Sequence, residues 1–138
     1  MEAERSVKNV IRIPTSLEGK FFRYWLGFLS QFHNLTPREM DVAEAFIRQR
    51  FELSKSITDP VLLDQIVMNE DSKRKIKADC HISDAHFQVI MGKLRKSKII
   101  IGDKLNSKFI PKGLKAGDHS SSLLLYFDLD AGDPKKDS

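Results

Sequence analysis

Apolar residues recur near the start of the chain in two successive patterns, one typical of a strand and one of a helix. Residues 9–13 alternate apolar and polar side chains until Pro14, which predicts a short edge strand. Ser16 can then act as an N-cap, and apolar residues follow at intervals of three and four, which predicts an aromatic helix. The members of this helical pattern are Leu17, Phe21, Trp25, Phe28, Leu29 and Phe32.

Three further helices are predicted before residue 81. Thr36 to Glu39 supplies a capping hydroxyl, a proline at the first helical position and a carboxylate at the third, and an amphipathic pattern continues to about residue 53. Asp59-Pro60 repeats the cap and proline for a short helix through Met68. A basic helix is expected to begin at Asp71-Ser72 and to end near Cys80.

The next segment predicts another helix followed by a hairpin. Ser83 can cap a helix in which apolar residues repeat on one face, and the β-branched run 99–101, the turn at Gly102-Asp103 and the return through Leu105 to Pro111 predict two short antiparallel strands. The apolar face of the helix consists of Phe87, Ile90, Met91 and Leu94.

The remaining residues predict a loop and one last strand. Residues 112–122 contain glycines and serines, and 123–127 form a continuous apolar run. We expect a small sheet that pairs residues 9–13 with 122–129. We therefore expect a single mainly α (α+β) domain over 1–138. Its parts are a strand and aromatic helix at 9–35, a helical core with the hairpin at 36–111, and a loop, strand and charged tail at 112–138.

From Ser72 to Pro111, the order of basic helix, short turn, second helix and hairpin resembles the winged helix-turn-helix family. The resemblance implies that the second helix of the pair enters the major groove of DNA and that the hairpin, the wing, touches the backbone. At 100° per residue, the side of this helix opposite its apolar face carries a line flanked by polar and basic residues. The line is Ala85, Val89, Gly92 and Lys96, with His86 and Lys93 on one side of it and Gln88 and Arg95 on the other. The candidates for nucleic-acid contact on this helix are Gln88, Lys93, Arg95 and Lys96.

The centre of that line is small and apolar, whereas base readout uses Arg, Lys, Asn or Gln. Close approach of another protein surface is therefore a second possibility for this helix. On the preceding helix, four basic residues could neutralise phosphates or form an ordinary solvated face. They are Lys73, Arg74, Lys75 and Lys77.

Composition and charge exclude several classes of function. The chain has 138 residues, a formal net charge of +4 and one cysteine, so it has no internal disulfide and no multi-cysteine zinc site. Its start lacks a signal-peptide pattern, and no apolar run is long enough for a membrane span. Phosphate-loop, serine-hydrolase and zinc-hydrolase motifs do not occur, so we expect no enzyme activity, cofactor, metal or small-molecule substrate.

The full chain is also similar to small proteins of crAss-like tailed phages of gut Bacteroidales, across residues 12–25 and 86–95. This resemblance implies a structural subunit of the virion, such as a head-to-tail connector or tail ring, that contacts other copies of itself or other virion proteins. The alternatives are a cytoplasmic regulator of transcription that binds double-stranded DNA and an adaptor that binds another protein.

An assembly subunit would explain an excess of apolar surface. Phe22, Tyr24 and Leu26 lie off the main apolar line of the first helix, so most of its circumference needs cover from protein. The apolar run 123–127 needs burial on both faces. The predicted interface residues are Trp25, Phe28, Ala85, Val89, Gly92, Leu123, Leu125 and Phe127.

Overall fold

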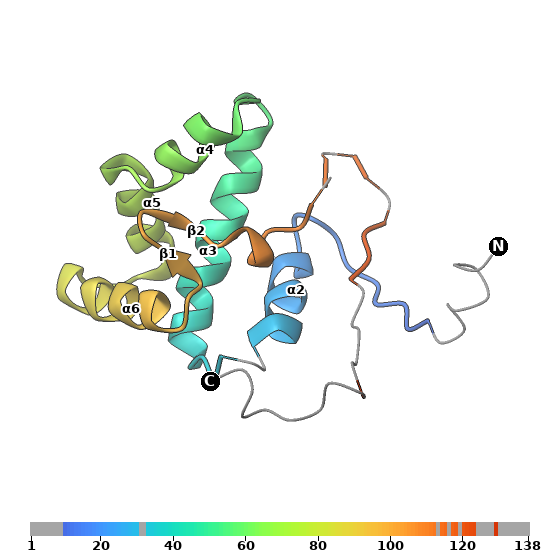
Figure 1. The fold of residues 1–138 in the computed structure, drawn as a ribbon, viewed down its shortest axis with the longest axis horizontal. Helices are drawn as coiled ribbons and strands as arrows, with labels where there is room; N and C mark the ends of the chain where they lie inside the picture. The colour runs from blue at the N-terminus through green and yellow to red at the C-terminus, as the bar shows by residue number, and fades with distance from the viewer. Residues whose placement is uncertain are drawn as a thin grey trace.

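The helix α3 (Pro37–Ser54) is the central element of the fold, and every other helix packs against it (Figure 1). The computed structural model describes residues 10–30, 33–112, 114–115, 117–118, 120–123 and 129. Within these residues the chain is mainly helical, with five helices followed by a small two-stranded antiparallel sheet. The other elements are α2 (Phe21–Ser30), α4 (Pro60–Val67), α5 (Glu70–Cys80), α6 (Asp84–Lys96), β1 (Ile100–Ile101), β2 (Lys104–Leu105) and the short 3-10 helix η1 (Ser107–Phe109).

The predicted starts of three helices are confirmed, because each cap makes the hydrogen bond that its residue type favours. At α3 the Glu39 backbone N–H donates to Thr36 Oγ1 at 3.2 Å, and the Thr36 N–H donates to Glu39 Oε1 at 3.1 Å. At α4 the Asp59 side chain accepts from the Val61 N–H, and at α6 the Ser83 side chain accepts from the His86 N–H. The helix α5 begins slightly earlier than predicted, because Asn69 is its cap.

The core lies between α3, α6 and the hairpin. The predicted apolar face of α6 is confirmed, since all four of its residues are at most 2% exposed. The rings of Phe46 on α3 and Phe87 on α6 lie 6.2 Å apart, and Ile100 and Leu105 of the hairpin are buried in the same cluster. This packing fixes α6 by its inner face and leaves its outer face free.

The predicted strand at 9–13 is wrong for the part of it that the structure describes. Residues 10–13 have no regular structure, and Val10 and Ile11 are exposed. The predicted pairing with 122–129 is not formed by 10–13, because β1 and β2 make up the sheet of the described residues. A short alternating run gains a strand conformation only from a partner, and Pro14 removes a backbone donor that pairing would use.

The aromatic helix begins later than the apolar pattern suggested. Residues 17–20 form turns, and the N–H groups of Gly19 and Phe21 both donate to the carbonyl of Ser16, at 3.0 and 3.3 Å. The Arg48 guanidinium of α3 binds the carbonyls of Leu17 and Gly19 at 2.9 and 3.0 Å. These carbonyls therefore turn toward α3 rather than along a helix axis, and α2 starts only at Phe21.

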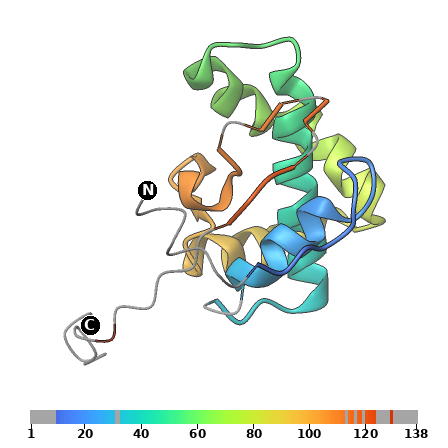
Figure 2. The same ribbon diagram turned by 90° about the vertical axis from the view of Figure 1, so that its right-hand side faces the viewer.

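The buried face of α2 is also rotated from the predicted line. Phe22 and Leu26 are fully buried against α3, whereas Trp25 is half-buried and Phe28 is 39% exposed. Figure 2 shows the reason, because α2 lies against α3 at the end of the molecule away from α4 and only one side of it faces the core. The helix ends at Ser30, and Phe32 lies outside the described residues.

The hairpin is confirmed, with Ile100 opposite Leu105 and Ile101 opposite Lys104. Its return strand is shorter than predicted, because the chain turns into η1 after Asn106. The Asn106 side chain accepts from the Lys108 N–H at 3.1 Å, which favours the turn over a continued strand. Leu123 is not in a strand, and residues 124–128 lie outside the described residues.

Candidate nucleic-acid interface

The outer face of α6 is exposed along its whole length. Ala85, Val89, Gly92 and Lys96 all lie on the solvent side, as the helical spacing predicted, and Val89 is 61% exposed. The flanking Gln88, Lys93 and Arg95 are exposed as well. A Cβ atom built on Gly92 meets no atom within 4 Å, so the space over this residue is open.

Two tight connections hold α6 at its ends. Before it, His81 adopts the left-handed conformation (φ 56°), and the Ile82 N–H donates to the Lys77 carbonyl at 3.0 Å. After it, Lys98 is left-handed too (φ 66°), and the Ile99 N–H donates to the Leu94 carbonyl at 3.0 Å. These caps place α6 at a fixed angle to α5 and carry the chain directly into the hairpin.

Positive charge gathers on α6, the hairpin and the segment after it. Residues 84–112 hold seven basic and two acidic residues, a net charge of +5, whereas the remaining residues hold sixteen basic and seventeen acidic, a net charge of −1. The net charge of the whole chain therefore arises in this one segment. The basic residues are Lys93, Arg95, Lys96, Lys98, Lys104, Lys108 and Lys112, and all are exposed.

None of these seven cations is paired with a carboxylate of the described residues. Elsewhere in the molecule cations are paired: Arg50 with Asp64 at 3.0 Å and Lys55 with Glu52 at 2.9 Å are two examples. Unpaired basic side chains keep their full charge for an external anion. The α6 and hairpin surface is thus the part of the described molecule best suited to a polyanion.

The basic residues of α5 are in a different situation. Arg74 pairs with Asp71 at 2.7 Å, Lys75 with Asp79 at 2.8 Å and Lys77 with Asp84 at 2.9 Å. Lys77 also lies over the Phe87 ring, with Nζ 5.5 Å from its centroid. Lys73 is half-buried and forms no ion pair with the described residues. The structure therefore does not bring these four residues together as a free basic patch.

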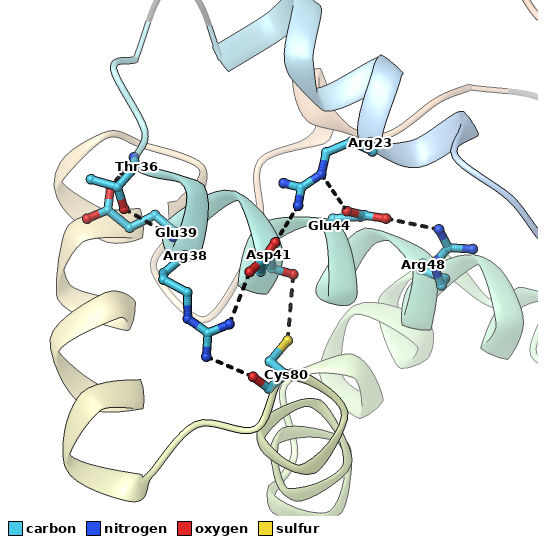
Figure 3. Close-up of polar contacts among 8 residues, drawn as sticks. All are labelled: Arg23, Thr36, Arg38, Glu39, Asp41, Glu44, Arg48 and Cys80. Carbon is cyan, nitrogen blue, oxygen red and sulfur yellow. Dashed lines mark hydrogen bonds and ion pairs between the residues drawn. The ribbon is translucent and has the colours of Figure 1, made fainter.

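An ion-pair network joins α2 to α3 along one side of α3 (Figure 3). Arg23 of α2 pairs with Asp41 and, at 3.2 Å, with Glu44. Asp41 also pairs with Arg38 at 3.1 Å, and Glu44 pairs with Arg48 at 3.0 Å. The network shows that charges on this side are satisfied internally, in contrast to those on α6.

Cys80 lies at the edge of this network and is half-buried. Its thiol donates to the Asp41 carbonyl with a sulfur–oxygen distance of 3.7 Å, and the Cys80 carbonyl accepts from Arg38 at 2.8 Å. Burial, and then the nearby negative charge of Asp41, raise the pKa of the thiol above its ordinary value. At neutral pH the group is a protonated core filler and a poor nucleophile.

Of the predicted interface residues outside α6, the structure describes Trp25, Phe28 and Leu123. Trp25 donates from Nε1 to the Phe109 carbonyl at 3.0 Å, so its polar atom serves contacts within the chain. Phe28 and Tyr24 are exposed on α2, and Leu123 is half-buried. Leu125 and Phe127 lie outside the described residues.

The pattern of the sequence did not single out Lys98, Lys104 or Lys108, which the structure places beside α6. The available signal was the clustering of charge by segment, because residues 84–112 carry a net charge of +5 and residues 1–83 only +1. Spacing on a helix finds only the residues of that helix, whereas these three follow it in a cap, a strand and a 3-10 turn.

Comparison with known proteins gives no independent identification: no family model, no curated protein and no solved structure matches the chain. Over the part of the chain that the structure describes, no helix combines the length and apolar character needed to cross a membrane. Among the same residues, no group of three or more His, Cys, Asp or Glu side chains could hold a metal ion.

Proposed function

We propose that this chain is a non-enzymatic protein that binds double-stranded nucleic acid with α6 and the hairpin. In this proposal α3, α5, α6 and the hairpin are a winged helix-turn-helix, with α6 as the helix that faces the major groove and β1–β2 as the wing. The observation that carries it is the segregation of charge, since exposed cations without a carboxylate partner lie on α6 and the hairpin.

The proposed contacts are mainly to phosphates. Lys93, Arg95 and Lys96 lie in the last turn of α6 and flank an apolar centre at Val89. Phosphate contacts fix the position of a protein on the duplex without selecting a sequence, and Gln88 is the one described side chain of this face suited to a bidentate contact with adenine. We therefore expect affinity in the micromolar range, strong dependence on salt and weak sequence preference.

Charge reversal on α6, with charge reversal on α5 as the control, tests this proposal. The double variant Lys93→Glu with Arg95→Glu should lose at least about tenfold in affinity for a 20-base-pair duplex at 0.1 M salt, measured by fluorescence anisotropy. The matched control, Arg74→Glu with Lys75→Glu on α5, changes the net charge by the same amount and should lose much less. Equal losses in the two variants, or no binding by the unmodified chain, would contradict the proposal.

A second candidate is a structural subunit of a tailed-phage particle, placed in a head-to-tail connector or tail ring. The observation that favours it is the open apolar centre of α6, where Val89 is 61% exposed between the small residues Ala85 and Gly92. Such a surface allows close approach of another copy or of another virion protein, and burial of a valine contributes roughly 1.5 kcal/mol or more.

Mass photometry separates the two candidates. A virion subunit should form a higher assembly alone or with other virion proteins, and Val89→Glu should disrupt that assembly while the melting temperature stays the same. A chain that remains monomeric with virion proteins present would count against the second candidate. A regulator of the first kind would act in the bacterial cytoplasm as a monomer or dimer.

A further inference from the structure

A hollow with a volume of about 680 Å³ lies at the C-terminal end of α6, between that helix, the end of α2 and η1. Three exposed lysines line it, Lys96, Lys98 and Lys108, and no Asp or Glu is among its described lining residues. The apolar part of the lining consists of Leu29, Ile101 and Phe109. Cationic and apolar groups are thus combined in one concave site.

Asn106 fixes the backbone on both sides of the hollow. Its Nδ2 donates to the Lys98 carbonyl at 2.9 Å, and its Oδ1 accepts from the Lys108 N–H at 3.1 Å. Its own backbone N–H donates to the Ile99 carbonyl at 2.8 Å. A single side chain therefore sets the separation of two lysine backbones that are ten residues apart in sequence.

Contacts with η1 also fix the side of the hollow that α2 and the residues after it form. Trp25 of α2 binds the Phe109 carbonyl at 3.0 Å through Nε1, and the His33 ring meets the Phe109 ring edge-on with centroids 4.9 Å apart. These contacts fasten the end of α2 to η1. The hollow is therefore formed by packed elements that are far apart in sequence.

Three carbonyls in the last turn of α6 accept hydrogen bonds beside this site. Ser97 Oγ donates to the carbonyls of Lys93 and Leu94 at 3.0 and 3.3 Å, and the Lys98 N–H donates to the Arg95 carbonyl at 3.1 Å. Satisfied carbonyls reduce the repulsion that the C-terminal end of a helix exerts on an anion. The three lysine charges therefore dominate the local field.

We propose that this hollow binds a sugar–phosphate unit of the nucleic-acid backbone, with Lys98 and Lys108 contacting the phosphate and Ile101 contacting the sugar. The inference rests on the proposed function, and it adds a second contact region that involves α2. Lys96 lies both on the outer line of α6 and in the lining of the hollow. A nucleic-acid strand bound along α6 would therefore pass directly into the hollow. Ammonium groups near apolar surface hold a phosphate more strongly than fully solvated ones.

The test uses a double variant, Lys98→Gln together with Lys108→Gln. It is compared with a control double variant that loses the same charge elsewhere. The control is Lys20→Gln with Lys55→Gln, at the turn before α2 and at the C-terminal cap of α3. Duplex affinity is measured by anisotropy over a range of salt concentrations, and thermal melting confirms that each variant folds. Each lost phosphate contact should lower affinity roughly five- to tenfold at 0.1 M salt and reduce the slope of log K against log salt by about 0.9.

The outcomes separate the hollow from the function on which it rests. A loss confined to the Lys98 and Lys108 variant, with a shallower salt slope, supports the site. If the unmodified chain binds the duplex and both double variants lose equally little, the hollow is not a phosphate site and the proposed function stands. If the unmodified chain does not bind the duplex at all, both proposals fail.

Discussion

Lys98 occupies a backbone conformation that glycine adopts most easily (φ 66°), directly after the last turn of α6. We predict that Lys98→Gly raises the free energy of unfolding by about 0.5–1 kcal/mol, because the strain of a side chain at this φ is relieved. Lys96→Gly, at the last position of α6, should instead lower it, by less than the roughly 1 kcal/mol that glycine costs in a helix interior. Urea denaturation measures both, and a destabilising Lys98→Gly would show that the cap depends on the lysine side chain.

At Cys80, burial and the charge of Asp41 raise the pKa of the thiol. The folded protein therefore holds the thiol proton more tightly than the unfolded chain does. The protonated thiol therefore stabilises the folded protein. This stabilisation is fully present below the ordinary pKa of a thiol and is lost as the pH rises through the raised pKa of Cys80. The prediction concerns the alkaline side of the pH range only.

Thiol labelling measures this effect. At pH 8 a disulfide reagent should modify Cys80 several-fold more slowly in the folded protein than in the chain unfolded in urea, and the difference should narrow as the pH rises past 9. Equal rates at pH 8 would mean that the thiol is open to solvent and ionises normally.

Among the elements, α2 depends on α3 through polar contacts as well as apolar ones. Arg48 binds the carbonyls of Leu17 and Gly19, pairs with Glu44 at 3.0 Å and lies over the Phe22 ring at 5.1 Å. We predict that Arg48→Met lowers the free energy of unfolding by about 2 kcal/mol, because two charge-assisted hydrogen bonds are lost.

Lys55→Met is the matched control for that variant. Lys55 also covers a phenylalanine ring, Phe51, and pairs with Glu52, but both partners of the ion pair are largely exposed. Lys55→Met should lower the free energy of unfolding by less than about 0.5 kcal/mol, measured by urea denaturation. Similar costs for Arg48→Met and Lys55→Met would show that Arg48 does not hold the turn before α2.

The elements that were predicted correctly from the sequence are those fixed by contacts between residues close together in the chain. The Thr36, Asp59 and Ser83 caps and the apolar face of α6 depend on neighbours within a few residues, so spacing is enough to find them. The start of α2 and the conformation of residues 10–13 depend on distant partners. Arg48, thirty residues away, decides where α2 begins, and no local pattern contains that contact.

In the candidate site, too, the features set by local contacts could be predicted from the sequence, and those that need distant contacts could not. The exposed residues of α6 were predictable, because the opposite face of the same helix is visibly apolar. The hollow was not, because it requires α2, η1 and the end of α6 to meet. The basic residues of α5 were a plausible phosphate patch by sequence, but their partners Asp71, Asp79 and Asp84 lie close enough to pair with them.

At the scale of the whole molecule, the question is which surface needs a partner. The described core is closed, with Phe22, Phe46 and Phe87 at most 1% exposed, and Trp25 has its hydrogen bond inside the chain. The apolar run 123–127, on which the expectation of a protein partner also rests, lies outside the described residues except for Leu123. Some large apolar side chains are exposed, Val61 at 65% and Val89 at 61% among them. The charge is also uneven, with a net charge of +5 over residues 84–112 against −1 for all others.

The most direct test of this account is a map of backbone amide shifts when a short duplex is added to the nitrogen-15-labelled chain. The largest shifts should fall on α6 from Gln88 to Lys96 and on the hairpin through Lys108, and they should diminish as salt is raised. Amides around Glu52 should not move. Shifts centred on α5 or on Tyr24 and Phe28 of α2, or no shifts at low salt, would contradict it.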